Sequence, residues 1–541
     1  MHYSNHSLSS FYFRFRQRST FLLLLAGLIL LPLSVQAEMV FRKGNGAEPG
    51  SLDPQIAEGV PASNILRDLY EGLTTEAADG AIIPGVAERW DVSEDGKTYL
   101  FHLREAKWSN GDPVTAGDFV YGWTRALNPA TGSEYSFLLF PLENAQAIAG
   151  GEQEDLTALG VKAIDDKTLE VKLVGPAPYF LSMITHSIAM PVHRATVEAH
   201  GEQWTKPGNM VSNGPFTLAE WVPQSRIVLE KSSTYWDKEQ VGLDKVIYYP
   251  TEDQNAELKR YRAGELDFTY EIPNDQIRWI RENLPDEFRV ANYLGTYYYG
   301  FNTEQPPFKD NLELRKAFSM AIDRELLIEK IVTAGEVPAY AFVVPGVTAY
   351  DPVYVDFMEL KGAAREEEIQ RLYKEAGYSK DNPIEVEIRY NTNENHKKIA
   401  IAIASMWKKT FNAKVKLINE EWKVYLETRK QKQATQVFRA GWIGDYNDPY
   451  TFLELFLSDS GLNDVGFDSG EYDKLLAEAS LASDADTRKQ MLQQAERIFL
   501  DTHSLAPIYH YVSKRLVKPS VKGLVDNVMD HHRSKYVTIA E

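Results

Sequence analysis

The chain has 541 residues, of which 44% are hydrophobic and 25% are charged. This composition is typical of folded globular proteins and excludes a disordered tract or a polytopic membrane protein, and the length indicates several compact units. The 77 acidic and 58 basic residues give a formal net charge of -19, which repels phosphate backbones, so no nucleic acid partner is expected. The cysteine count of 0 excludes disulfides, thiolate catalysis and cysteine-based metal sites.

The amino-terminal segment has the pattern of a secretory leader. Three arginines between positions 14 and 18 precede an apolar run from Phe21 to Leu33, and Val35-Gln36-Ala37 supplies small residues where a signal peptidase reads. We predict a signal peptide over 1–37, cleaved after Ala37, and therefore export. The alternative is a membrane anchor, but the run is shorter than the ~20 apolar residues that span a bilayer.

Short apolar runs alternate with amphipathic segments along the rest of the chain, which favours an α/β fold. Residues 87–129 are expected to form a meander of strands followed by a helix. A helix is predicted from Leu314 to Val332, and another from Ala363 to Ala376 that ends at Gly377, a favourable C-cap residue.

The clearest supersecondary pattern lies between residues 384 and 442. Alternating or β-rich runs predict strands over 384–388, 415–417 and 436–442, with helices between them. Such a βαβαβ unit favours a parallel sheet, in which ligands bind at the carboxyl ends of the strands. The functional site is therefore expected beside Trp442 and the residues that follow it.

Familiar catalytic motifs are absent from the sequence. Gly96-Lys97-Thr98 lacks the preceding phosphate-binding loop, and neither a G-x-S-x-G elbow nor an H-E-x-x-H helix occurs. His531-His532, beside Asp530, is the densest histidine cluster, and we expect it to be a solvated turn near the chain end rather than a metal site. No cofactor or metal is predicted. A peptidase assembled from residues distant in sequence stays open as an alternative.

Several segments, taken in their order and spacing, are similar to one known family. They are Glu48-Pro49-Gly50-Ser51-Leu52-Asp53-Pro54, Pro84-Gly85-Val86-Ala87-Glu88-Arg89-Trp90, residues 98–103 with 106–115, Thr296-Tyr297-Tyr298-Tyr299, residues 391–398, and Arg439-Ala440-Gly441-Trp442-Ile443-Gly444-Asp445-Tyr446-Asn447-Asp448-Pro449. Together they resemble the extracytoplasmic solute-binding proteins of family 5, the oligopeptide-binding and murein-peptide-binding proteins of ABC importers.

The resemblance implies a bilobal periplasmic-binding-protein fold, type II, cluster C, with an extra inserted domain. It places lobe I at 38–60, 186–294 and 513–541, the inserted domain II at 61–185, and lobe III, the main peptide-anchoring lobe, at 295–512. The implied function is a monomeric periplasmic receptor that captures peptides of about 2–5 residues and delivers them to an ABC permease with its ATPase subunits. A murein tripeptide receptor is the alternative, and an exported hydrolase is a further one.

Three residues carry the expected capture of the peptide termini. The resemblance assigns Asp445 to the ligand's ammonium, and places Arg439 and His396 near its carboxylate. The residues themselves favour these roles, because an Arg within an apolar strand needs a partner and His396 lies in the first turn of a helix that Asn393 caps. The alternatives are an Asx turn for Asp445, an internal salt bridge for Arg439 and an exposed position for His396.

Other positions match the ligand-lining residues of the family. They are Glu48, Tyr135, Tyr298, Trp422, Arg429, Gly441, Trp442 and Tyr511. Tyr135 and Trp422 could equally be core residues. One departure concerns Val332, which stands where the oligopeptide receptors can carry a lysine that reaches a ligand carboxylate. Carboxylate capture is then expected to depend on Arg439, His396 and Arg429, which leaves the murein-peptide alternative open.

Overall fold

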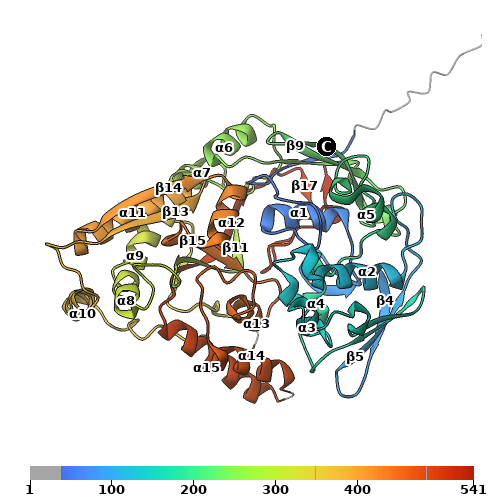
Figure 1. Ribbon diagram of the computed structural model, residues 1–541. Coiled ribbons are helices and arrows are strands. Elements are labelled where there is room, and N and C mark those ends of the chain that lie inside the picture. The colour runs from blue at the N-terminus through green and yellow to red at the C-terminus, as the bar shows by residue number, and fades with distance from the viewer. Residues whose placement is uncertain (1–37, 348, 483, 541) are drawn as a thin grey trace, which may run out of the picture. The chain divides into compact units, whose positions relative to one another are not determined.

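The computed structural model describes residues 38–347, 349–482 and 484–540 (Figure 1). The predicted signal peptide lies outside the described residues. Residues Glu38–Glu541 form one compact unit. None of the helices described within it is both long enough and apolar enough to cross a membrane.

Two four-stranded sheets lie outside the six-stranded sheet described below. The first has the strand order β1-β10-β9-β8, with β1 parallel to β10 and the other neighbours antiparallel. The second is antiparallel, with the order β4-β5-β7-β6. Their strands are β1 (Val40–Gly44), β8 (Phe216–Val222), β9 (Arg226–Lys231) and β10 (Lys245–Tyr249), and β4 (Ala87–Val92), β5 (Thr98–Leu103), β6 (Val161–Asp165) and β7 (Thr168–Lys172).

A six-stranded mixed sheet has the order β12-β16-β11-β15-β13-β14. Its strands are β11 (Phe288–Phe301), β12 (Val337–Pro338), β13 (Glu385–Asn391), β14 (Lys414–Glu420), β15 (Val437–Ile443) and β16 (Leu505–Leu516). Two short pairs complete the strands: β2 (Thr74–Glu76) with β3 (Ile82–Pro84), and β17 (Val521–Lys522) with β18 (Thr538–Ile539). Each short pair and each four-stranded sheet falls inside one predicted domain, whereas β11 and β16 cross the predicted boundaries at 294 and 512.

The helices connect and cover these sheets. They are α1 (Val60–Leu69), α2 (Ala116–Leu127), α3 (Ala145–Ala149), α4 (Phe180–Met183), α5 (Arg194–His200), α6 (Gln254–Arg262), α7 (Ile277–Asn283), α8 (Leu312–Met320), α9 (Arg324–Leu327), α10 (Gly362–Glu375), α11 (Glu394–Phe411), α12 (Trp422–Gln431), α13 (Tyr450–Leu453), α14 (Gly470–Leu481) and α15 (Ala485–Asp501).

The predicted βαβαβ unit is present as β13-α11-β14-α12-β15. Strand β13 is parallel to both β14 and β15, so the carboxyl ends of all three meet at one edge of the sheet. The meander followed by a helix at 87–129 is confirmed by β4, β5 and α2, and the helix before Gly377 is confirmed by α10. These segments have strong local periodicity, which explains why the sequence predicts them well.

The helix predicted from Leu314 to Val332 is wrong as a single helix. It is divided into α8, α9 and a π-helical turn at Ile328–Val332. The break occurs because Asp323 acts as a new N-cap, accepting a hydrogen bond from the Leu326 N–H at 2.9 Å.

Strands β11 and β16 join the six-stranded sheet to the remainder of the chain. They pair from Phe288 to Gly300, with register shifts between Asn292 and Thr296 and between Tyr297 and Tyr298. Within the described residues, the chain between 295 and 510 therefore leaves and re-enters the rest through two neighbouring strands. A pivot of the six-stranded part against the remainder would turn on these two strands.

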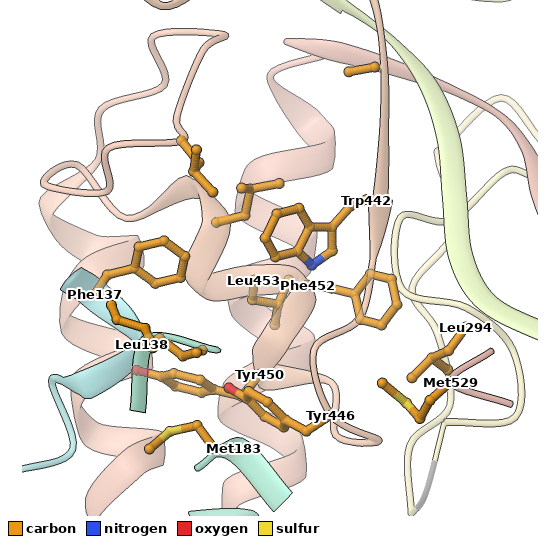
Figure 2. Packing of buried hydrophobic residues seen from close by; sticks show 14 of the residues in the cluster. Phe137, Leu138, Met183, Leu294, Trp442, Tyr446, Tyr450, Phe452, Leu453 and Met529 are labelled. Carbon is orange, nitrogen blue, oxygen red and sulfur yellow. The ribbon is translucent and has the colours of Figure 1, made fainter. Parts of the chain in front are cut away.

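The main hydrophobic core extends between these parts. Figure 2 shows Trp442, Tyr446 and Tyr450, from β15 and the segment after it, packed beside Phe137, Leu138 and Met183. The first three side chains belong to the six-stranded part, and the last three to the segment predicted as the inserted domain. The two parts are thus in apolar contact.

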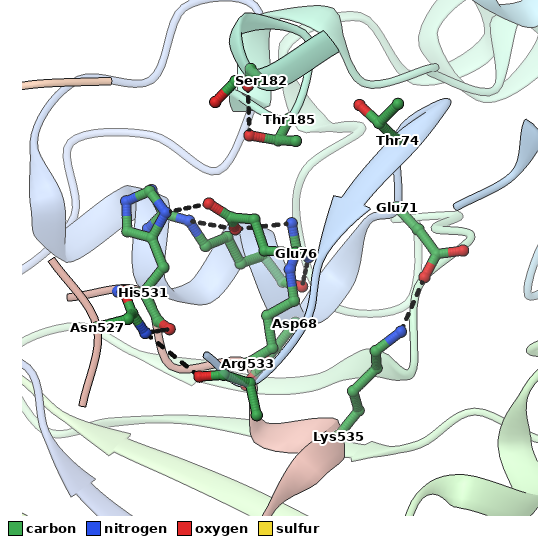
Figure 3. Close-up of polar contacts among 12 residues, drawn as sticks. Asp68, Glu71, Thr74, Glu76, Ser182, Thr185, Asn527, His531, Arg533 and Lys535 are labelled. Atoms are coloured by element: carbon green, nitrogen blue, oxygen red, sulfur yellow. Dashed lines mark hydrogen bonds and ion pairs between the residues drawn. The ribbon is translucent and has the colours of Figure 1, made fainter. Parts of the chain in front are cut away.

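The carboxyl-terminal tail is held by a buried polar network, part of which Figure 3 shows. His531 contacts Glu76 at 2.5 Å, Arg533 pairs with Glu76 at 3.4 Å, and Lys535 pairs with Glu71 at 3.2 Å. The expectation of a solvated turn at His531-His532 is wrong, because the tail folds back over α1 and β2 and both rings are largely buried. The network joins the predicted inserted domain to the tail of lobe I.

Candidate functional site

A cavity opens at the carboxyl ends of β13 and β15, where the βαβαβ unit predicts a ligand site. Centres of water molecules can occupy about 240 Å³ of it. Its walls come from the six-stranded part, from residues 46–67 and 251–271 beside the first four-stranded sheet, from Tyr135, and from the tail at Asp530 and His531. Segments more than 400 residues apart in sequence therefore share one site.

One edge of β15 is free to receive a further strand. Strand β13 pairs with β15 only at Val437 and Phe438, whereas β11 pairs with β15 as far as Ile443. Gly444 donates its N–H to the Leu294 carbonyl at 2.8 Å, which sets the alternation of the ladder. By this alternation the main-chain groups of Gly441 and Ile443 point away from β11, and both residues line the cavity.

Asp445 lies directly beyond β15, with its side chain 13% exposed. Its backbone N–H donates to Thr451 Oγ1 at 3.0 Å, which fixes the turn. Its Oδ2 atom is buried and has no hydrogen-bond partner among the residues that the structure describes. Burial raises the pKa of Asp445 to about 7, against a smaller lowering by the Arg67 guanidinium. An unsatisfied carboxylate oxygen at a cavity wall favours a cationic ligand group.

Aromatic rings surround this carboxylate. The Tyr135 ring stacks on the His186 ring, with centroids 4.8 Å apart, and also on the Trp442 ring, with centroids 6.2 Å apart. Trp442 Nε1 donates to the Thr451 carbonyl at 2.7 Å, which holds the indole in place. Tyr135 and Trp442 both line the cavity, as the sequence predicts, and both also pack against the main core.

Arg439 lies four residues before the end of β15, on the same cavity wall. Its Nη2 donates to the Tyr511 hydroxyl at 2.7 Å, and its guanidinium lies 4.7 Å from the centre of the Tyr297 ring. Its Nη1 donates to Asn391 Oδ1 at 3.4 Å, no carboxylate pairs with it among the described residues, and its Nε is buried without a partner there. The predicted alternative, an internal salt bridge, is therefore not found in this part. Gly441 leaves room for this arrangement, because a Cβ there would stand 2.4 Å from the Tyr511 hydroxyl.

His396 follows the predicted cap of α11. Asn393 Oδ1 accepts the N–H groups of Asn395 and His396 at 2.9 and 3.1 Å, which confirms Asn393 as the N-cap. The imidazole is buried rather than exposed, and burial, together with Arg439 and Lys514, lowers its pKa well below the usual value. It is therefore a neutral ring that can donate one hydrogen bond into the cavity.

Three further predicted residues line the cavity on the side of α12: Tyr298, Trp422 and Arg429. Arg429 is already engaged, because its Nε forms an ion pair with Asp464. Trp422 has a buried Nε1 with no partner among the described residues. Val332, at the position of the missing lysine, is fully buried and does not line the cavity.

Glu48 is the one predicted lining residue that the cavity wall does not include. Its Oε1 accepts the Trp221 indole N–H at 2.6 Å, and its Oε2 accepts the Gln224 N–H at 3.0 Å. Glu58, ten residues later, occupies the wall instead, and burial raises the pKa of its carboxyl to about 7. Because Glu58 immediately precedes Gly59-Val60-Pro61 at the start of α1, its proximity to a helix start is the signal that could have found it.

Arg67 and His531 are wall residues that the sequence reasoning missed. Arg67 Nη2 lies 2.5 Å from His531 Nε2, and its Nε lies 4.0 Å from Glu76. The Arg67 charge also opposes the rise in the pKa of Asp445. No local pattern relates residue 67 to residue 531, since the contact arises only when the tail folds back.

Comparison with known proteins identifies the family. The model for the bacterial extracellular solute-binding proteins, family 5 Middle, matches residues 81–464. The chain belongs to this family. The periplasmic oligopeptide-binding protein OppA of Escherichia coli (strain K12) is 42% identical over 513 residues, which cover 92% of this chain and 93% of that protein.

Two solved structures share the fold. The murein tripeptide-binding protein MppA of Escherichia coli is 38% identical and superimposes with a TM-score of 0.91, covering 93% of this chain and 99% of that one. Haemophilus influenzae OppA in complex with the peptide RPPGFSPFR is 40% identical and has a TM-score of 0.90, with the same coverage. The fold is thus the bilobal, mixed helix and sheet architecture of periplasmic solute-binding proteins, as predicted.

Proposed function

We propose that this protein is a periplasmic receptor that captures short peptides by their main chain and termini and delivers them to an ABC importer. The observation that carries the proposal is the buried, unpartnered Asp445 oxygen at the end of a β-strand edge that lacks a neighbour. The names of the relatives, which describe oligopeptide and murein peptide binding, support the same conclusion.

The α-ammonium of the ligand would bind Asp445. A buried carboxylate and ammonium that are held together resist separation, since removal of one partner typically costs about 3–5 kcal/mol, roughly 10²–10³-fold or more in affinity. The peptide main chain would add to the free edge of β15 at Gly441 and Ile443, where each hydrogen bond contributes about 0.5–1.5 kcal/mol whatever the side chain.

The ligand's carboxylate would bind Arg439, with His396 as a neutral donor beside it. Ile443 lies four residue steps beyond Arg439 along β15, which corresponds to about 13 Å at a rise of about 3.3 Å per residue. An extended peptide of three or four residues has a similar length, since each residue spans at most about 3.3–3.6 Å. This supports the predicted preference for peptides of about 2–5 residues.

A murein tripeptide is a second candidate ligand. It is favoured by the similarity to MppA and by Val332, which leaves no cation at a position where oligopeptide receptors can have one. Glu48, Tyr135, Tyr298, Trp422, Arg429, Gly441, Trp442 and Tyr511 are proposed contacts or supports in either case, with Glu48 acting only through Trp221 and Gln224.

We propose a transport role without catalysis, in the periplasm, as a monomer that a permease and its ATPases unload. The relatives are solute-binding proteins, which supports a receptor rather than a hydrolase. Mass spectrometry after incubation with peptides should find them intact, and released fragments would contradict this part of the proposal.

Calorimetry with a tripeptide and its N-acetylated form tests the ammonium site. The free amine should bind at least 100-fold more tightly than the capped peptide, and Asp445→Asn should remove the difference. Asp91→Asn is a matched control, because Asp91 is exposed and outside the cavity wall. Equal affinity for capped and uncapped peptides would refute the proposal. A wall-derived tripeptide in the same titrations distinguishes the two ligand classes.

A further inference from the structure

His186 lies behind the cavity wall, next to the anchoring carboxylate. Its Nε2 lies 3.6 Å from Asp445 Oδ1, while the unpartnered oxygen of Asp445 is Oδ2. The two oxygens thus have different surroundings: one faces the imidazole, and the other is left without a protein donor in the described structure. The separation is about 0.5 Å longer than an N–H···O hydrogen bond, so a small approach completes the contact.

The tautomer of His186 is set by its local structure. Its Nδ1 accepts the Ile188 N–H at 3.3 Å, as the cap of the short helix at Ser187–Ala189. Because Nδ1 is an acceptor there, the proton of the neutral ring is on Nε2, the nitrogen that faces Asp445. The ring is also fixed in orientation by its stack on Tyr135.

His186 is neutral in this environment. Burial, together with the Arg67 cation and His531, lowers its pKa to about 3, against an opposing effect of Glu76. These groups come from α1, from β2 and from the tail, the polar network of Figure 3. A neutral donor can orient a carboxylate without cancelling its charge, whereas a protonated ring would form an internal ion pair.

We infer that His186 is a positioning residue for the ligand's ammonium: its Nε2–H holds one oxygen of Asp445, so that the other oxygen is turned to the ligand. The inference rests on the proposed function. The inference also gives the segment that carries His186 a part in recognition. This segment supplies the hydrogen-bond donor only while it is packed against the end of β15. The anchor is then complete only when the segment that carries His186 packs against Asp445.

Three substitutions test the role by calorimetry with the free and acetylated tripeptides. His186→Phe keeps the ring stack but has no donor, and should weaken binding of the free amine by about tenfold, the effect of one hydrogen bond to a charged group. It should leave the acetylated peptide unchanged. His186→Gln restores an N–H donor and should bind within about threefold of the parent. His186→Lys places an ammonium inside the protein and should abolish the preference for a free amine.

His193→Phe is the matched control. His193 caps α5 in the same way, accepting the Thr196 N–H at Nδ1 at 3.3 Å, but its Nε2 faces Asp112 at 3.0 Å and not Asp445. It should leave peptide affinity unchanged, and thermal unfolding should show all variants folded. Equal binding by His186→Phe and the parent, or equal loss for free and acetylated peptides, would overturn the inference. Failure of the parent protein to bind any peptide would instead refute the proposed function.

Discussion

Tyr179 offers a test of whether closure of the cavity contributes to affinity. Its ring stacks on the rings of Tyr446 and Tyr450, with centroids 4.9 and 5.5 Å apart, and Arg488 lies 5.2 Å from its centre. Arg488 is itself held by two hydrogen bonds to Asp448, at 2.8 and 2.9 Å. None of these five residues lines the cavity. Tyr446 and Tyr450 belong to the part that β11 and β16 join to the rest of the described chain, and Tyr179 does not.

We expect Tyr179→Ala to lower the binding affinity for all peptides by the same factor. Two stacked rings contribute about 0.5–1.5 kcal/mol each, and the cation–π contact about 0.5–1 kcal/mol. A loss of about 2–3 kcal/mol from the closed state lowers its population, and affinity falls in proportion, by roughly 30- to 150-fold. Calorimetry with several unrelated peptides measures this directly.

Tyr179→Phe should behave differently. The Tyr179 hydroxyl is buried and has no partner in the described residues, so its removal relieves a cost and affinity should stay equal or improve. Tyr99→Ala is the control, because Tyr99 stacks on Phe101 and Phe180 and not on the six-stranded part. An unchanged Kd for Tyr179→Ala, or a loss confined to certain peptide sequences, would refute the reasoning.

Two further predictions concern stability. Burial raises the pKa of Asp445 to about 7, so the unliganded native state binds more protons than the unfolded chain between about pH 4 and 7, and stability falls as pH rises through that window. Asp445→Asn should therefore raise the melting temperature of the unliganded protein at pH 8, because it removes a destabilisation of up to about 4 kcal/mol. At pH 4 the substitution should not raise the melting temperature. An unchanged melting temperature at pH 8 would count against this prediction. Glu76→Gln leaves Arg67 and Arg533 without their shared carboxylate and should destabilise the protein by about 3–5 kcal/mol in urea unfolding. Asp91→Asn, at an exposed pair, should leave the urea midpoint unchanged, and equal midpoints for both variants would contradict the importance of the tail network.

The sequence predicted the parts of the site that depend on residues close together in the chain. The βαβαβ unit, the cap at Asn393 and the position of Asp445 beyond β15 follow from periodicity, from the preference of Asn for helix starts and from the rule for strand ends. The resemblance to family 5 added the roles of the residues, and comparison confirms the family. The roles themselves stay proposals.

Long-range contacts explain what the sequence did not predict. Arg67 meets His531 from 464 residues away, and Asp445 lies beside His186 from a distant part of the chain; no spacing rule encodes either contact. Glu48 and Glu58 flank the same segment, and only the packing of Trp221 against Glu48 shows which of them reaches the cavity. The break after α8 depends on a single residue, Asp323, which caps the next helix. A prediction made from periodicity alone misses this cap.

The unpaired stretch of β15 lies within the cavity and not on an outer face of the sheet. Exposed strand edges invite other proteins to pair with them, and many folds protect such edges with charge or curvature. Here the edge is protected because it is enclosed. Only a chain narrow and short enough to enter the cavity can form hydrogen bonds with the unpaired stretch of β15. The enclosure that would admit a small peptide thus also keeps the same hydrogen-bonding groups away from other proteins.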